Sequence, residues 1–166
     1  MRKINIILFI LIPIFSFTQN NSKDDIRWMS LEDARLYAKE YNQNILIYFY
    51  KKDCEYCDKM KKNTLSDPEI IKLINNNFYP VKFDSRTKDE IEYNGKKYGN
   101  QQPKKDGSWW RHDFYYEVAK YTKDGKDLST TPTISVFDKD FKLIKSFPGE
   151  RSKIWLKTAL KKIINK

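Results

Sequence analysis

Hydrophobic and polar positions alternate along the chain in blocks that predict helices and strands. Apolar residues between Leu31 and Tyr41 recur at the spacing of one helix face, and Ser30 supplies an N-cap. This pattern predicts a helix that ends near residues 42–44. Residues 45–50 are an unbroken β-branched and aromatic run, typical of a strand that is buried on both faces.

A second helix is predicted directly after this strand. It begins around Cys54 and runs to about Thr64. Asp67 as an N-cap, followed by Pro68 at the first helical position, restarts the helix for a further segment. The next apolar run, residues 78–83, predicts another strand.

The region from residue 85 to 128 has a different composition, rich in Lys, Gly, Asn and Gln and with few aliphatic residues. The Asn94-Gly95 pair favours a type I′ turn and predicts a small hairpin over residues 92–98. Residues 112–121 are compatible with a helix. We therefore interpret residues 85–128 as an insertion within one domain.

The last part of the chain predicts a hairpin and a helix. Strands at residues 133–137 and 141–147 are joined by a tight turn at 138–140. Ser152 then caps a final helix. The residues assigned to the buried side of this helix are Ile154, Trp155, Ala159, Leu160 and Ile163.

This order of elements predicts an α/β fold. The first two strands are joined by a helical segment and should be parallel, whereas the last two should be antiparallel. The result is a mixed central sheet flanked by helices on both faces. A length of 166 residues suits one domain, predicted to span residues 28–166.

The N-terminus has the layout of a secretory signal peptide over residues 1–18. Two basic residues precede an apolar run from residue 4 to 15, and the small residues Ser16 and Thr18 then precede the predicted cut. Residues 19–27 are predicted to be a flexible leader. This predicts a protein of the periplasm or a secreted one, without stable membrane insertion after cleavage; an uncleaved anchor is the alternative.

Composition and charge narrow the class of protein. Aromatic residues make up 15% of the chain, which favours a packed globule over a disordered segment. The formal net charge is +10, from 32 basic and 22 acidic residues, but the lysines are scattered and often stand beside acids. A nucleic-acid binder would gather them on one stripe, so no nucleic-acid partner is expected.

The two cysteines, Cys54 and Cys57, carry the candidate chemistry. A Cys-x-x-Cys pair at the start of a helix places Cys54 where free backbone N–H groups and the helix dipole stabilise a thiolate. Cys57, one turn later, is positioned to resolve a mixed disulfide. Tyr56 lies inside the motif and is expected to be exposed and to touch substrates.

Three other interpretations of the cysteine pair compete with this one. Zinc binding needs four ligands, and the chain adds only His112 to the two cysteines, so no metal site is predicted. A purely structural disulfide would close a very small loop and constrain the unfolded chain little. An inactive redox motif on a binding module remains open.

Several segments resemble secreted or periplasmic bacterial thioredoxin-like proteins. They are residues 45–57, residues 59–69, residues 77–82, Thr131-Pro132-Thr133 and Gly149. The resemblance covers about residues 28–84 and 128–165, and it implies a thioredoxin fold with the insertion before the strand that follows a cis-proline. It also implies that Pro132 is cis and lies opposite Cys54, with the Thr131 backbone pairing with an extended substrate peptide.

The chain also departs from thioredoxin itself. Tyr48 stands where thioredoxins carry a buried acid, and Asp53 stands where they carry Trp. Asp53 and Glu55 place negative charges beside Cys54, which should raise the pKa of its thiol. A strong oxidant needs a strongly stabilised thiolate, so a reductase or general exchange role is favoured.

The insertion contains a dense aromatic cluster, and His112 lies within it. The cluster is interpreted as the insertion's own small core, with a partner-binding lip as the alternative; it comprises Trp109, Trp110, Phe114, Tyr115 and Tyr116. His112 is interpreted as an exposed helix-start residue, with a proton shuttle near the cysteines as the alternative. Trp28 and Trp155 are expected in the core.

These observations predict a thiol–disulfide oxidoreductase that acts on exported proteins through Cys54 and Cys57. The expected partners are disulfide-containing or dithiol proteins and a membrane-bound redox partner, with no metal or organic cofactor, and the protein is expected to be a monomer. The alternative is a non-catalytic binding or assembly module with a structural disulfide. A disulfide isomerase is less favoured, because no dimerisation domain is evident.

Overall fold

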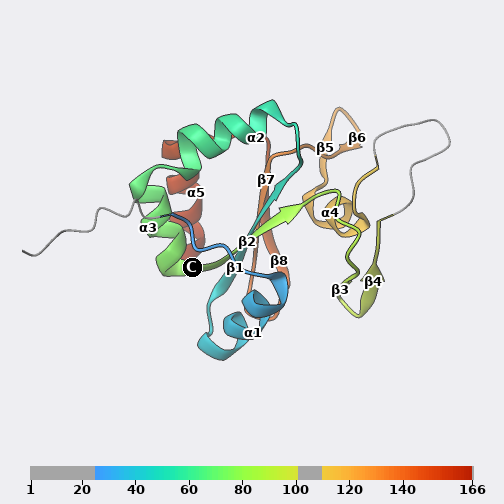
Figure 1. Cartoon of the computed structure of the whole chain (residues 1–166), viewed down its shortest axis with the longest axis horizontal. Coiled ribbons are helices and arrows are strands. Elements are labelled where there is room, and N and C mark those ends of the chain that lie inside the picture. The colour runs from blue at the N-terminus through green and yellow to red at the C-terminus, as the bar shows by residue number, and fades with distance from the viewer. Residues whose placement is uncertain (1–24, 101–109, 166) are drawn as a thin grey trace, which may run out of the picture.

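A computed structural model describes residues 25–100 and 110–165 (Figure 1). Its centre is a four-stranded sheet with the strand order β2-β1-β7-β8. As predicted, β1 and β2 are parallel, and β7 and β8 are antiparallel. The strands are β1 (Asn44–Tyr50), β2 (Phe78–Asp84), β7 (Thr133–Phe137) and β8 (Leu143–Pro148).

Helices cover both faces of this sheet, because the side chains of β1 alternate between two hydrophobic clusters. One cluster joins Ile45, Ile47 and Phe49 to α1 (Leu31–Tyr41) and α4 (Asp113–Ala119). The opposite cluster joins Leu46 and Tyr48 to the remaining helical segments. These are α2 (Glu55–Met60), the π-helical turn η1 (Lys61–Leu65), α3 (Pro68–Asn77) and α5 (Lys153–Ile164).

The helix starts follow from the caps in the sequence. The side chains of Ser30, Asp67 and Ser152 each accept a hydrogen bond from a backbone N–H in the first turn of the following helix. Pro68 occupies the first position of α3, as predicted. The helix that was predicted to run to about Thr64 instead changes to π geometry after Met60.

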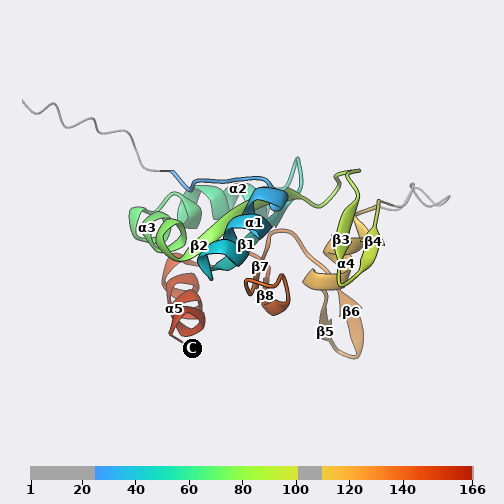
Figure 2. The same cartoon turned by 90° about the horizontal axis from the view of Figure 1, so that it is seen from below.

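The insertion forms two small hairpins around α4. The predicted one is β3 (Ile91–Tyr93) with β4 (Lys96–Tyr98), and its turn residues Asn94 and Gly95 have φ values of 52° and 71°. A second hairpin, β5 (Tyr121–Lys123) with β6 (Lys126–Leu128), was not predicted. Figures 1 and 2 show both hairpins and α4 at the opposite end of the molecule from α3 and α5.

The aromatic cluster of the insertion is not a separate small core, contrary to the prediction. Phe114 and Tyr115 are fully buried against the central sheet, and Phe49 of β1 lies in ring contact with both of them. The insertion therefore shares its core with the sheet. Trp109 lies outside the described residues.

The buried side of α5 also differs from the prediction. Ile154 is 75% exposed and Trp155 42% exposed, so neither belongs to the core. Leu156 and Leu160, one helix turn apart, are the fully buried residues. The prediction included Ile154 and Trp155 because they are apolar, but the face of α5 that packs against the sheet begins only at Leu156. Trp28 is half-buried and packs against the same cluster as these leucines.

The predicted signal peptide, residues 1–18, lies outside the described residues, as does the leader up to residue 24. Cleavage and the domain boundaries therefore remain predictions. Within residues 25–100 and 110–165, no helix is both long enough and apolar enough to span a membrane.

Candidate active site

Cys54 lies just beyond the end of strand β1, after a short turn. Strand β1 ends at Tyr50, and Asp53 in the turn adopts a left-handed backbone with φ 55°. Cys54 then serves as the N-cap of α2, where its sulfur accepts a hydrogen bond from the Cys57 backbone N–H at 3.2 Å. The sequence-predicted position of Cys54 at a helix N-terminus is thus present, with a backbone N–H aimed at the sulfur.

Cys54 and Cys57 are joined by a disulfide across the first turn of α2, with their Cα atoms 5.2 Å apart. The two residues are buried to nearly the same extent, 6% and 4% exposed. Burial therefore does not distinguish an attacking from a resolving sulfur. The cap position does, because only the Cys54 sulfur receives a helix N–H.

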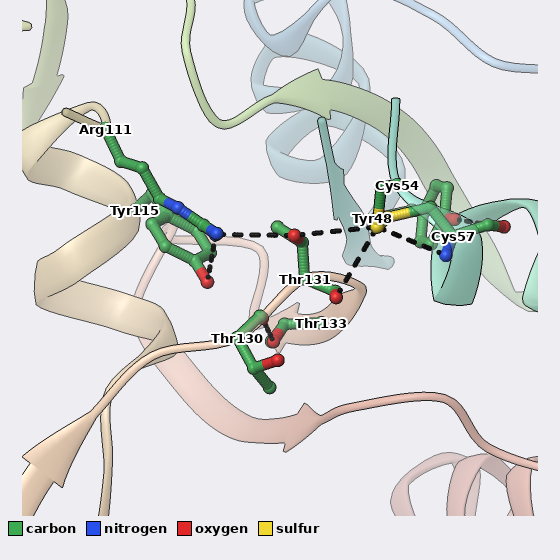
Figure 3. Close-up of a disulfide and its surroundings, with 8 residues drawn as sticks. All are labelled: Tyr48, Cys54, Cys57, Arg111, Tyr115, Thr130, Thr131 and Thr133. Carbon is green, nitrogen blue, oxygen red and sulfur yellow. Dashed lines mark hydrogen bonds between the residues drawn. A yellow bond between two sulfur atoms is a disulfide. The ribbon is translucent and has the colours of Figure 1, made fainter. Parts of the chain in front are cut away.

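Thr131 lies directly opposite Cys54. The Thr131–Pro132 peptide bond is cis, as the resemblance implied. The carbonyl oxygen and the hydroxyl oxygen of Thr131 lie 3.6 and 3.7 Å from the Cys54 sulfur (Figure 3). A thiol formed at Cys54 on reduction is within reach of both oxygens.

Tyr48 lies beneath the pair, on the strand that leads to it. Its hydroxyl donates a hydrogen bond to the carbonyl oxygen of Cys57 at 3.2 Å (Figure 3). Burial, followed by the negative charge of Asp58, raises the pKa of Tyr48 well above its usual value. The phenol therefore stays protonated and acts as a donor here, not as a proton acceptor.

The outer rim of the motif is exposed. Tyr56 is 58% exposed, in accord with its predicted place inside the motif. Glu55 forms an ion pair with Lys59 at 2.7 Å, and this interaction lowers the pKa of Glu55. The Lys59 ammonium also lies 5.3 Å from the centre of the Tyr56 ring. The negative charge of Glu55 is therefore opposed locally, whereas Asp53 is exposed in the turn before Cys54.

The thioredoxin-like domain pattern matches residues 31–164 of the chain. The chain belongs to the thioredoxin-like domain family. The match includes the Cys54–Cys57 pair and Thr131-Pro132, and it runs through residues 85–128 as well.

Solved structures show the same fold at low sequence identity. The DsbH oxidoreductase matches with a TM-score of 0.60 and 15% identity over 91% of this chain and 92% of that one. A thioredoxin from Thermus thermophilus matches with a TM-score of 0.57 and 16% identity over 84% and 87% of the two chains. A thioredoxin-fold protein from Helicobacter pylori matches with a TM-score of 0.54 and 19% identity over 75% and 71%.

Among curated proteins, mouse anterior gradient protein 3 is 28% identical over 68 residues. The match spans 40% of this chain and covers only 41% of that relative's length. It is a partial similarity, and nothing about the whole relative follows for this thioredoxin-like protein.

His112 is a structural residue of this thioredoxin-like domain. It is fully buried, which corrects the expectation of an exposed residue. Its Nδ1 accepts a hydrogen bond from the Phe114 N–H at 3.1 Å, and its Nε2 lies 2.7 Å from the carbonyl oxygen of Asp89. The tautomer with the proton on Nε2 satisfies both contacts. Burial lowers the pKa of His112. Both ring nitrogens are engaged within the insertion.

Arg111, an insertion residue that the sequence did not single out, reaches the site beside Tyr115 of the predicted aromatic cluster. The Arg111 guanidinium donates hydrogen bonds to the Tyr115 hydroxyl at 3.0 Å and to the Thr131 hydroxyl at 3.4 Å (Figure 3). The only signal in the sequence was a basic residue beside an aromatic cluster. Within the part of the chain that the structure describes, no three His, Cys, Asp or Glu residues are grouped to hold a metal ion.

Proposed function

We propose that the protein is an exported thiol–disulfide oxidoreductase, with reductase or general exchange activity on disulfide-containing or dithiol proteins. The observation that carries the proposal is the position of the Cys54 sulfur. It lies at a helix N-terminus, bonded to Cys57, and faces the backbone oxygen and hydroxyl of Thr131. This arrangement combines a stabilised thiolate with a resolving cysteine and an exposed rim.

The reductive cycle begins with the Cys54 thiolate. It attacks one sulfur of a substrate disulfide, so a bond forms between Cys54 and that sulfur, and the other substrate sulfur leaves as a thiolate. The Cys57 thiolate then attacks the Cys54 sulfur. This step breaks the mixed disulfide and releases the second substrate thiolate, so the substrate has gained two electrons.

The protein ends the cycle with the Cys54–Cys57 disulfide. A dithiol on a redox partner, expected at a membrane, returns two electrons and becomes a disulfide itself. In this proposal an extended substrate segment lies along Thr131-Pro132, and Tyr56 contacts it from the rim. The same steps in reverse would oxidise a substrate dithiol.

The test is a Cys57→Ser variant, which is unable to resolve mixed disulfides. When it is expressed with its N-terminal segment in a bacterium, we expect adducts with exported proteins that a reducing agent releases. The matched Cys54→Ser variant should form far fewer. Reduction of insulin by the wild-type protein with dithiothreitol is the second measurement. Absence of both adducts and insulin reduction would contradict the proposal and favour the binding or assembly module.

Export is tested separately. Cell fractionation should place the protein outside the cytoplasm, and the mature N-terminus should be Gln19 by mass spectrometry. An intact N-terminus in the membrane fraction would instead identify an uncleaved anchor.

A further inference from the structure

Arg111 is held in place by its neighbours in the insertion. The backbone N–H of His112 donates to the carbonyl oxygen of Ser85 at 2.8 Å, and the N–H of Asp113 donates to that of Gly99 at 2.9 Å. The buried His112 ring adds its contact with Asp89. His112 and Asp113, the two residues that follow Arg111, are therefore anchored to the backbone of the insertion, and they fix the position of the Arg111 backbone.

The half-buried Arg111 side chain extends from this anchor to the Thr131 platform. Its guanidinium lies 5.2 Å from the centre of the Tyr115 ring and donates to the hydroxyls of Tyr115 and Thr131. The Thr131 hydroxyl is 3.4 Å from the Arg111 nitrogen and 3.7 Å from the Cys54 sulfur, so nitrogen and sulfur are at most about 7 Å apart. Figure 3 shows this line from Arg111 through Thr131 to Cys54.

We propose that Arg111 is a positioning residue for the exchange reaction: it fixes the Thr131 hydroxyl against Cys54 and places a positive charge beside the thiolate that forms there. The inference rests on the proposed function, because it assigns a role in that same reaction to the insertion. Tyr115 supports the role by holding the guanidinium through its hydroxyl and its ring.

Other charged groups lie around the same side of the site. Arg86 follows β2, and Lys51 and Asp53 precede Cys54 in the chain. The pKa of Lys51 is lowered by burial and then by the positive charges of Arg111 and Arg86, while Asp53 opposes this effect. On the other side, Glu55 is paired with Lys59. Arg111, Arg86 and Lys51 therefore lie close enough to act on one another electrostatically.

The chemical consequence follows from the charge change on reduction. A dithiol donor transfers two electrons to the Cys54–Cys57 disulfide and becomes a disulfide. One of its two protons goes to Cys57, which becomes a thiol, and the other goes to solvent, which leaves a thiolate at Cys54. A fixed positive charge stabilises this thiolate relative to both the thiol and the disulfide. Arg111 should therefore lower the pKa of the Cys54 thiol and make the pair easier to reduce.

The experiment measures the alkylation rate of Cys54 by iodoacetamide against pH, by mass spectrometry, in reduced protein with Cys57→Ser as the common background. The midpoint of this pH profile is the pH at which the alkylation rate is half its maximum. We expect Arg111→Gln to raise the midpoint by about half to one pH unit. The matched control is Arg35→Gln. Like Arg111, Arg35 donates a hydrogen bond within the protein, in this case to the carbonyl oxygen of Glu92, and its guanidinium lies 4.9 Å from the centre of an aromatic ring, that of Phe141. It lies on α1, at the opposite end of the sheet from α2 (Figure 1).

Two further variants keep the inference falsifiable if Arg111→Gln does not fold. Arg111→Lys retains the charge and should leave the midpoint near that of the parent. Thr131→Val removes the bridging hydroxyl and should raise the midpoint. An unchanged midpoint in Arg111→Gln would overturn the inference, and so would an unchanged midpoint in Thr131→Val if Arg111→Gln does not fold. An equal shift in Arg35→Gln would overturn it as well.

This measurement needs no substrate, so it separates the two proposals. A raised midpoint in Arg111→Gln, together with an absence of trapped adducts, would support the effect of Arg111 on Cys54 but contradict the exchange function. Trapped adducts together with an unchanged midpoint in Arg111→Gln would support the exchange function and contradict the role of Arg111.

Discussion

The hydroxyl of Tyr48 donates a hydrogen bond to the carbonyl oxygen of Cys57 at 3.2 Å, which ties β1 to the first turn of α2 beneath the disulfide. The same carbonyl also accepts the helical hydrogen bond from the Lys61 N–H. The tyrosine thus occupies the position of the buried acid of thioredoxins with a group that donates a proton and does not accept one. Tyr48 is therefore not a proton acceptor for Cys57 in the proposed reaction.

Replacing Tyr48 by Phe should lower the free energy of unfolding by about 1 kcal/mol at pH 7, because one buried hydrogen bond is lost but the carbonyl keeps its helical partner. The pKa of Tyr48 is raised in the folded state, chiefly by burial. The unfolded phenol loses its proton first, so this contribution is full below about pH 10 and declines above it.

Urea denaturation at several pH values measures both effects. The decline above about pH 10 should be shallower in Tyr48→Phe than in the wild type. Tyr116→Phe, at an exposed tyrosine, is the control and should follow the wild type. Parallel alkaline curves for Tyr48→Phe and the wild type would contradict the prediction.

Replacing His112 by Asn should flatten the acid side of the stability profile. Burial lowers the pKa of His112 in the folded state. The stability that comes from this neutral imidazole is therefore full above about pH 6.5 and is lost as the pH falls through the folded pKa. Asn is itself a good N-cap, so α4 should still form.

The measurement is the free energy of unfolding between pH 8 and pH 5 for the wild type and His112→Asn. The wild-type curve should fall more steeply, by up to about 1.4 kcal/mol per pH unit, which is the limit for one proton. The carboxylates are common to both proteins and cancel in the difference. Identical slopes would show that His112 does not titrate differently on folding.

Much of the fold was predictable because its signals are local. The caps Ser30, Asp67 and Ser152 and the apolar run of β1 each act over a few residues, and each is present as predicted. The second hairpin was missed although the φ values of Asp124 and Gly125, 50° and 71°, nearly equal those of Asn94 and Gly95. Four of its six strand residues are polar, and only Tyr121 among the six is partly buried, so no hydrophobic pattern marked the strands.

Only those site residues were predictable that lie close together in the sequence or that the family resemblance implied. Cys54, Cys57 and Thr131 meet in the structure, but Arg111 reaches them across a separation of 20 residues from Thr131. Its part depends on how the insertion folds onto the sheet. No local pattern distinguishes it from the other basic residues of a strongly basic chain.

Phe114→Ala tests whether the insertion and the sheet form one cooperative unit. Phe114 is fully buried between the Phe49 and Phe137 rings of the sheet and the Tyr93 ring of the first hairpin. Truncation should cost about 3–5 kcal/mol, because it leaves a cavity shared by both parts. Unfolding should remain a single transition, by near-UV and far-UV circular dichroism together. A separate early transition would show that the insertion folds independently.

The acidic residues beside Cys54 should differ in their effect on its reactivity. Both Asp53 and Glu55 are exposed, but the charge of Glu55 is opposed by Lys59 at 2.7 Å. Glu55→Gln should therefore change the alkylation midpoint of Cys54 by less than about 0.3 pH units. Asp53→Asn should lower it by about 0.3–0.5 units, since removing a negative charge favours the thiolate.

Asn is the appropriate replacement at residue 53 because it tolerates the left-handed backbone that Asp53 adopts there. A Lys59→Gln variant completes the comparison. It frees the Glu55 carboxylate and should raise the midpoint, and Glu55→Gln in that background should then restore it. If Glu55→Gln lowers the midpoint more than Asp53→Asn in the parent protein, the ion pair does not shield the thiolate, and Glu55 is the main acidic influence on Cys54.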